Sequence, residues 1–151
     1  MLNAIKKMFS PPGQRTVEVP AIGKMWQRDD EWESELVFTL PDGAEVVMPI
    51  SIPGDENGPF TALVIHVAQA RERYADLLPM ALQEILALQN VFLDADQVSE
   101  ALEGPSLTID AFQDGPIVWA LQYTLDTDDD GDAAYFVRFT DWTLTITNVV
   151  A

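Results

Sequence analysis

Hydrophobic and polar residues alternate in two separate blocks of this chain, one near each end. In the first block, residues 16–19 predict a short strand and residues 35–52 predict a hairpin. Two β-prone runs in the hairpin flank Pro41–Gly43, where proline presets φ and glycine accepts a positive φ. Residues 24–35 lie between these strands and combine many charges with two tryptophans, so we expect a loop or a distorted strand there.

The middle of the chain follows a helical period instead. Apolar residues recur every three or four positions over 60–77, which predicts a helix with one face in the core. We expect Asn57 or Gly58 to cap this helix and Pro59 to occupy its first position, where the missing N–H costs nothing. Residues 80–93 are apolar on nearly every side, as is typical of a central, largely buried helix.

Pro79 separates the two helical patterns, and we expect it either to kink the first helix or to start the second. Asp94 and Gln97 have the spacing of a capping box, which predicts a short third helix over 97–103. The pair Gly104–Pro105 follows and is expected to end that helix.

Alternation returns after the helices and predicts four more strands, over 106–112, 117–125, 133–139 and 142–150. In the last of them, threonines alternate with aliphatic residues, which is typical of a strand with one side in water. Blocks of strands around a block of helices predict an α+β fold. We expect about three N-terminal strands, a central pair of helices plus a short helix, and about four mostly antiparallel C-terminal strands.

The length of 151 residues suits a single globular domain over 1–151. Residues 2–9 predict one or two helical turns, and we treat 1–14 as a loosely attached N-terminal segment. The sequence has neither an apolar run as long as a membrane span nor the apolar region of a signal peptide, so we expect a cytoplasmic protein. The absence of cysteine excludes disulfides and thiolate metal sites.

Charge changes this ordinary picture. Twenty-five acidic residues against eight basic ones give a net charge of −17, and residues 74–137 contain thirteen acids without a single Lys or Arg. Such a field repels nucleic acids and anionic membranes and attracts cationic surfaces. We therefore expect a basic protein partner and no direct binding to nucleic acid or membrane, with solubility alone as an equally good explanation of the charge.

The densest acidic stretch is DTDDDGD at 126–132. Its aspartates and glycine match the first, third, fifth, sixth and seventh positions of an EF-hand calcium loop. The twelfth position should be a bidentate glutamate but is Val137, and both flanks predict strands where an EF-hand has helices. We therefore favour a long hairpin tip, either solvated or facing a positive surface, and keep a weak divalent-cation site as an alternative.

A second acidic cluster, RDDEWESE at 28–35, surrounds Trp32, and Trp26 lies just before it. Carboxylates beside exposed aromatic rings suit a protein interface, because the ring supplies contact area and the charges steer a basic partner. The alternative is that both tryptophans fold inward and the acids are merely solvated. We favour this alternative slightly, since tryptophan is mostly buried in proteins.

Catalytic signatures are missing from the sequence. His66 is the only histidine, and on the predicted helix it shares a face with Gln69 and Arg73 that we expect to be solvated. The chain contains no phosphate-binding, dinucleotide-binding, serine-hydrolase or zinc-protease motif, and no nucleophile or ligand set has the spacing to work with His66. We therefore expect a protein that is not an enzyme, without a catalytic residue, metal site or cofactor.

Four segments are grouped by a common resemblance: IGKMWQRDDEW (22–32), DGAEVVMPISIP (42–53), MALQEILALQN (80–90) and SLTIDAF (106–112). Together they resemble small bacterial domains of unknown function of the kind found beside polymorphic-toxin immunity proteins. The resemblance implies a non-enzymatic, partner-binding role, and it transfers no functional residue to this sequence.

These observations predict a non-enzymatic, acidic binding protein of the immunity or inhibitor type, which occludes a basic surface on a toxin or a nucleic-acid-processing enzyme. A divalent-cation-responsive domain that uses Asp126–Asp132 is one alternative. A DNA-mimicking inhibitor, for instance one encoded by a phage, is another. The predicted partner-binding residues are Asp29, Asp30, Glu31, Trp32, Glu33, Asp128, Asp129, Asp130 and Asp132.

Overall fold

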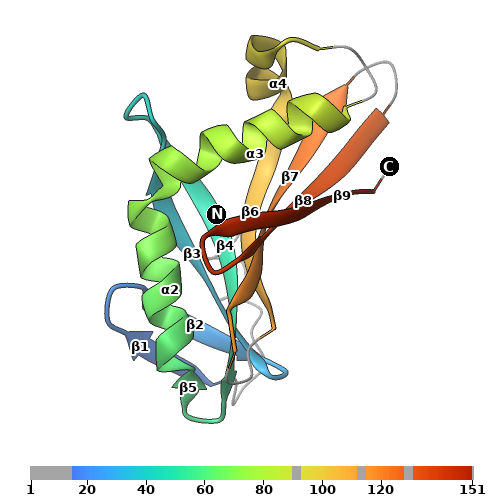
Figure 1. Ribbon diagram of the computed structural model, residues 1–151. Coiled ribbons are helices and arrows are strands. Elements are labelled where there is room, and N and C mark those ends of the chain that lie inside the picture. The colour runs from blue at the N-terminus through green and yellow to red at the C-terminus, as the bar shows by residue number, and fades with distance from the viewer. Residues whose placement is uncertain (1–14, 90–92, 112–114, 128–130, 151) are drawn as a thin grey trace.

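The computed structural model describes residues 15–89, 93–111, 115–127 and 131–150. In this part a block of five strands precedes three helices and a block of four strands, which confirms the α+β fold (Figure 1). The strands are β1 (Thr16–Val19), β2 (Gly23–Arg28), β3 (Glu31–Thr39), β4 (Glu45–Asp55), β5 (Gly58–Pro59), β6 (Leu102–Ala111), β7 (Val118–Thr127), β8 (Gly131–Thr140) and β9 (Thr143–Val150). The helices are α2 (Thr61–Glu72), α3 (Tyr74–Leu88) and α4 (Ala95–Ala101).

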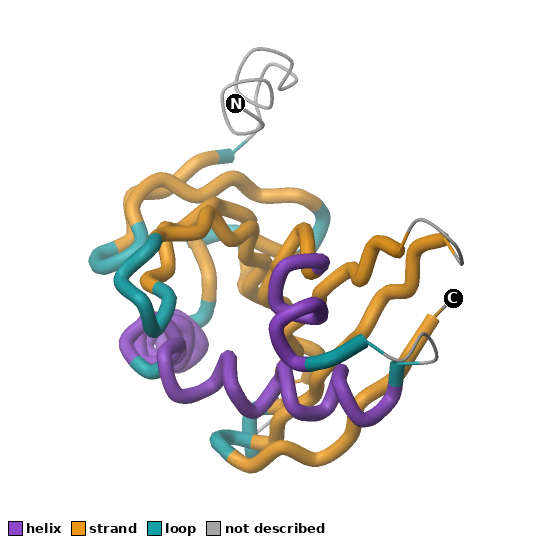
Figure 2. Tube along the Cα trace, turned by 90° about the horizontal axis from the view of Figure 1, so that it is seen from above, coloured by secondary structure: helices purple, strands orange, loops and turns teal. Residues whose placement is uncertain are grey.

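The strands form one sheet in the order β1-β2-β3-β4-β6-β7-β8-β9, with β5 paired to β4. Neighbouring strands are antiparallel except β4 and β6, which run parallel and join the two blocks. A parallel pair needs a crossover connection, and the three helices lie within it. The helices follow one face of the sheet, which curves around them (Figure 2).

Regular strands β2 and β3 occupy most of 24–35, so the prediction of a loop or a distorted strand there is wrong. The charges conceal a strict alternation, because buried residues of β3 such as Trp32 and Leu36 point toward the helices while acidic residues occupy the alternate positions. We call the face of the sheet away from the helices the outer face. On β3 its residues are Glu31, Glu33, Glu35, Val37 and Thr39.

The strand predicted over 16–19 and the hairpin predicted over 35–52 are confirmed. The β3–β4 turn contains Pro41–Gly43, and Gly43 has a φ of 89°, which side chains rarely allow. Its N–H donates to the Leu40 carbonyl at 2.9 Å and closes the turn. Strand β4 then continues further than predicted, to Asp55.

Helix α2 begins at Thr61, so the expected cap at Asn57 or Gly58 and the expected helical position of Pro59 are wrong. Gly58 and Pro59 instead form the short strand β5, which pairs with the end of β4. The backbone therefore satisfies its hydrogen bonds by strand pairing at this point, and the local preference for a helix cap loses to that longer-range contact.

The chain breaks between α2 and α3 at Arg73, which has φ of −93° and ψ of 3°. Pro79 lies inside α3, so it neither kinks the first helix nor starts the second as predicted. Pro79 and Ala75 are both exposed. Water can therefore reach the Ala75 carbonyl, to which the missing proline N–H would have donated.

Helix α3 buries only one side, with Met80 and Leu88 exposed, so the expectation of a largely buried helix over 80–93 is wrong for its described part. The capping box of α4 is confirmed, because Asp94 and Gln97 exchange two backbone-to-side-chain hydrogen bonds of 2.9 Å. This helix ends at Ala101, before Gly104–Pro105, because β6 already begins at Leu102.

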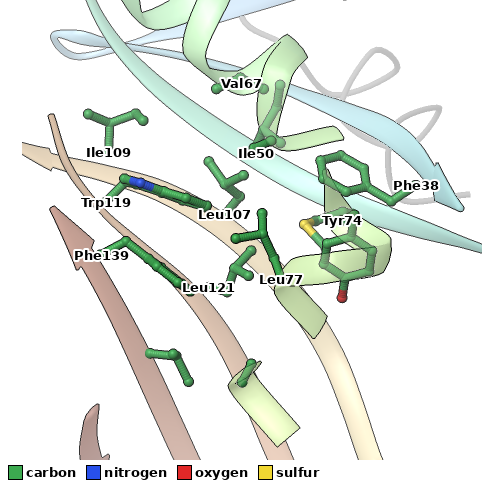
Figure 3. Packing of buried hydrophobic residues seen from close by; sticks show 14 of the residues in the cluster. Phe38, Ile50, Val67, Tyr74, Leu77, Leu107, Ile109, Trp119, Leu121 and Phe139 are labelled. Atoms are coloured by element: carbon green, nitrogen blue, oxygen red, sulfur yellow. The ribbon is translucent and has the colours of Figure 1, made fainter. Parts of the chain in front are cut away.

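The core lies between the inner face of the sheet and the helices, and Figure 3 shows its packing. Strand β7 contributes Trp119 and Leu121, and α3 contributes Leu77, all at most 4% exposed. The four predicted closing strands are confirmed as the antiparallel set β6 to β9. Within the described ranges, no helix has both the length and the apolar character that a membrane crossing needs.

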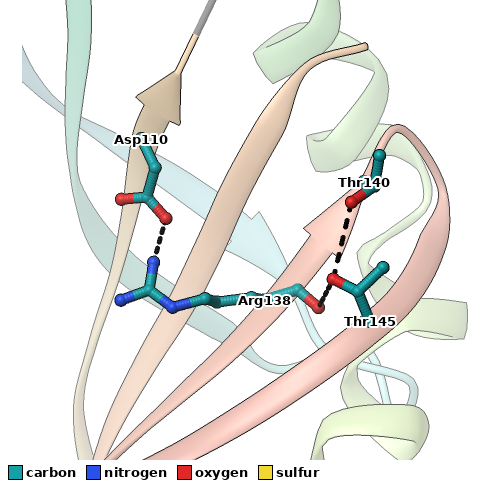
Figure 4. A network of polar contacts seen from close by, with 4 residues as sticks. All are labelled: Asp110, Arg138, Thr140 and Thr145. Carbon is teal, nitrogen blue, oxygen red and sulfur yellow. Dashed lines mark hydrogen bonds and ion pairs between the residues drawn. The ribbon is translucent and has the colours of Figure 1, made fainter.

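A polar network ties the closing strands together on the outer face (Figure 4). The Arg138 guanidinium of β8 reaches across β7 to form an ion pair with Asp110 of β6. On the other side of β8, the Thr145 hydroxyl donates to the Arg138 carbonyl at 3.2 Å, where the β8–β9 register shifts by a bulge. The one base of the second half of the chain is therefore held by an acid.

Candidate functional site

Five carboxylates gather at the turn between β2 and β3 and along the outer face of β3. The turn residue Asp29 has a φ of 55°, a left-handed conformation that Asp and Asn tolerate better than most residues. From Glu31 onward, every second residue of the strand is acidic and faces away from the helices. We call this group the acidic hairpin; its residues are Asp29, Asp30, Glu31, Glu33 and Glu35.

Short contacts orient part of the acidic hairpin. The Ser51 hydroxyl of β4 donates to Glu31 Oε2 at 2.7 Å. Arg28 Nε lies 3.3 Å from Glu33 Oε1, but the arginine side chain is 62% exposed, so this pair adds less than about 1 kcal/mol of stability. Asp29 and Asp30 are exposed at the turn. The result is a carboxylate surface on a rigid strand with its most accessible charges at one end.

Trp32, predicted as a partner-binding residue, lies in the core with an exposed fraction of 1%. Its indole Nε1 donates to the Asp55 carbonyl at 2.9 Å, which satisfies its only polar atom. Its ring cannot act as a contact surface in this conformation. The role of this tryptophan is to anchor the acidic hairpin to the end of β4.

Trp26 is also buried, with an exposed fraction of 4%, as the inward-folding interpretation of the tryptophans expects. It does not, however, share the core with Trp32. Its neighbour Met25 belongs to the core cluster, and successive residues of a strand point to opposite faces, so Trp26 lies on the outer face. Its register partner Glu33 belongs to the same face.

The second predicted acidic site, 126–132, is the end of the β7–β8 hairpin. The strands pair as far as Asp126 with Asp132 and Thr127 with Gly131, so the connection is shorter than the seven-residue tip that we expect from the sequence. The side chains of 126–132 and the backbone of Asp128–Asp130 lie outside the described residues. Both flanks are strands, as predicted, so the helix-flanked frame of an EF-hand does not form around this stretch.

A divalent-cation site at 126–132 therefore stays a prediction. Elsewhere, the residues with described placement include no group of three or more His, Asp or Glu side chains that could hold a metal ion. The two predicted acidic regions also do not form one surface. The β2–β3 turn lies at the lower end of the molecule in Figure 1, and the ends of β7 and β8 lie at the upper end.

His66 is buried, with an exposed fraction of 4%, so the expectation of a solvated position is wrong. Its ring stacks on Trp142 at 4.3 Å between centroids and meets the edge of Trp119 at 5.1 Å. Helix α2 is thus covered on a second side by residues from the end of the chain. The helical period of α2 could not reveal this, because Trp142 approaches only through the fold of the sheet.

Burial lowers the pKa of His66, the nearby Arg73 charge lowers it further, and the Asp141 charge opposes both. In the described structure the Nε2 atom is buried without a hydrogen-bond partner. Arg73 itself lies over the Trp142 ring, 4.2 Å from its centroid. A neutral imidazole packed among aromatic rings has no partner for acid–base chemistry, so we regard His66 as a packing residue.

Two tyrosines that the sequence analysis does not single out are hydrogen-bonded through their hydroxyls in the core, Tyr74 and Tyr123. Burial raises the pKa of both, and for Tyr123 the neighbouring hydroxyl raises it further. A small cavity of about 140 Å³ borders the pair and is lined mainly by aliphatic side chains. Both phenols are therefore neutral core groups, and no pattern in the sequence indicates that they meet.

A shallow groove of about 610 Å³ runs between β1 and α2. Its floor is mostly apolar, with Val19, Val64 and Ile65 among its residues, and Glu18 and Glu72 belong to its lining. It brings no pair of catalytic groups together, and it is separate from the acidic hairpin.

No family model matches this chain, and neither a curated protein nor a solved structure matches it significantly. The resemblance to domains found beside immunity proteins therefore stays a prediction. The chain is an α+β domain whose most distinctive described surface feature is the acidic hairpin.

Proposed function

We propose that this protein binds a basic surface of a partner protein through the acidic hairpin and thereby occludes that surface. The observation that carries the proposal is the placement of five carboxylates, two at an exposed turn and three on one outward strand face. Because the strand is already ordered, these charges can meet a partner with little further loss of conformational entropy. Complementary charge of this kind speeds association and selects the partner.

The charge of the whole chain supports a cationic partner. A net charge of −17 favours encounter with basic surfaces and opposes encounter with nucleic acid or anionic membrane. Proteins that act on nucleic acids carry basic surfaces, because they neutralise phosphates with Lys and Arg. We therefore propose an immunity-type or inhibitor role against a toxin or a nucleic-acid-processing enzyme.

Three variants separate the parts of this proposal. The turn variant, Asp29→Asn with Asp30→Asn and Glu31→Gln, removes three charges, and asparagine suits the positive φ of residue 29. The control variant, Glu84→Gln with Glu100→Gln and Glu103→Gln, removes three charges far from the acidic hairpin in sequence. The loop variant changes the second predicted acidic site; its substitutions are Asp128→Asn, Asp129→Asn, Asp130→Asn and Asp132→Asn.

Each tagged protein is used to capture partners from a lysate of the organism that encodes it. We expect the wild type and the control variant to recover the same basic protein, and the turn variant to recover about tenfold less, equivalent to about 1.4 kcal/mol. Equal recovery by the turn variant would refute the proposal. Equal recovery by the loop variant would remove Asp128–Asp132 from the binding surface, and competition by duplex DNA would identify a DNA mimic.

A further inference from the structure

Trp26 is buried although it lies on the outer face, away from the helices. Its exposed fraction is 4%, yet it is not a member of the core cluster, whereas Met25 beside it is completely buried inside that cluster. Its register partners Thr16 and Glu33 are polar residues of the neighbouring strands. A large apolar ring on the solvent side of a sheet needs a cover, because burial of its area is what stabilises it there.

Residues 1–14 join the fold directly beside this ring. Thr16, the first residue of β1, lies opposite Trp26, and Arg15 accepts a 3.0 Å hydrogen bond through its carbonyl from the N–H of Gln27. The attachment point of the segment is therefore fixed next to Trp26. Neighbouring strands lie about 5 Å apart, so even a few residues of chain suffice to reach across β2 and β3.

The composition of this segment complements the outer face. Leu2, Ile5, Met8 and Phe9 have the spacing of one side of a helix, and the segment contains two lysines and no acid. The surface beside Trp26 is the acidic strand β3. An apolar side for the ring and two positive charges for the carboxylates are what a cover of this surface requires.

We propose that residues 1–14 pack over Trp26 on the outer face, with their apolar side chains on the indole ring and Lys6 and Lys7 directed toward the carboxylates of β3. The segment is then an integral layer of the fold and not the loosely attached extension that its sequence suggests. This contact lies within the chain and does not depend on the proposed binding of a basic partner.

The test uses the full-length protein labelled with ¹⁵N at tryptophan, in which Trp26→Phe assigns the Trp26 indole signal. In the double variant Ile5→Asp/Phe9→Asp, we expect solvent exchange of the Trp26 indole N–H to rise by roughly tenfold or more. The indole N–H groups of Trp32 and Trp119 donate to the carbonyls of Asp55 and Asp141, so their exchange should not change. The control Asn3→Asp/Ser10→Asp adds the same two charges at polar positions and should leave all signals unchanged.

A second readout remains informative if exchange proves too slow to measure. Because the chain has no cysteine, Met8→Cys provides a unique site for a nitroxide label. We expect the label to broaden the Trp26 indole signal more than the Trp119 signal in samples of one labelled chain. Unchanged exchange together with no preferential broadening would overturn the proposal. Broadening only between labelled and unlabelled chains would overturn it as well, because the cover would then come from a second copy.

Discussion

His66 couples the stability of the fold to acid. A histidine in the unfolded chain titrates near pH 6.5, whereas burial among Trp119, Trp142 and the helix lowers its pKa in the fold. As the pH falls below about 6.5, the unfolded state binds this proton more readily than the folded state does. The stability that neutral His66 contributes is therefore complete above that pH and is lost below it.

We predict that the free energy of unfolding falls more steeply on acidification in the wild type than in His66→Phe, which keeps an aromatic ring but cannot titrate. Urea denaturation at a series of pH values below about 6.5 measures the two curves. The carboxylates titrate in both proteins, so only the difference between the curves reports on His66. Parallel curves would show that the imidazole titrates as freely in the fold as in the unfolded chain.

Gly54 shows a steric demand at the base of the acidic hairpin. A Cβ at this position would lie 2.2 Å from the Gly58 carbonyl oxygen and 2.7 Å from Cδ1 of Trp32, and the first of these is backbone that cannot move aside. The close approach of β5 to β4 and Trp32 therefore requires glycine here.

We predict that Gly54→Ala destabilises the protein by about 2 kcal/mol or more, because crowding displaces β5 or the Trp32 ring. Gly43→Ala is the comparison, since its Cβ would meet no atom within 4 Å and only the φ of 89° is unfavourable. It should cost about 1 kcal/mol. Thermal unfolding of both variants measures the difference, and equal losses would contradict the crowding argument.

At the scale of elements, the regular alternations and the capping signal were sufficient to predict most strands and α4. The failures have two physical causes. Charge concealed the alternation of β3, because its acids all lie on one face while Trp32 and Leu36 fill the core. Local signals at Asn57–Pro59 and Pro79 were overridden, first by pairing of β5 with β4 and then by the exposed position of the proline.

The capping box of α4 is an element whose contribution can be isolated. Asp94→Ala removes the side-chain acceptor for the Gln97 N–H, and we predict a loss of about 1 kcal/mol in the free energy of unfolding. Glu100→Ala, in the last turn of the same helix, should change it by less than about 0.5 kcal/mol. Denaturant unfolding of both variants provides the check. A cost for Asp94→Ala no greater than that for Glu100→Ala would show that the cap contributes little.

At the scale of the whole molecule, the sequence located the acidic residues but not their arrangement. It identified Asp29, Asp30, Glu31 and Glu33, yet it grouped them with Trp32, which the fold turns inward. It also treated two distant acidic stretches as parts of one surface, and these lie at opposite ends of the molecule. Strand direction and sheet order decide both points, and neither follows from composition.

The same global arrangement explains why His66 and the two core tyrosines escaped notice. Their partners come from strands in the second half of the chain, which pack on α2 and α3 only after the sheet has formed. A helical period reports which residues share a face, but not how many faces a helix buries. The central claim that remains for the whole molecule is electrostatic recognition by the acidic hairpin.

The most direct test of that claim is the affinity of the purified, captured partner for the wild type, the turn variant and the control variant as salt rises from about 0.05 M to about 0.5 M. The account predicts that the turn variant binds about tenfold more weakly than the other two at low salt. It also predicts a shallower salt dependence for the turn variant, so that the three affinities converge as screening increases. The same affinity and the same salt dependence in all three proteins would contradict it.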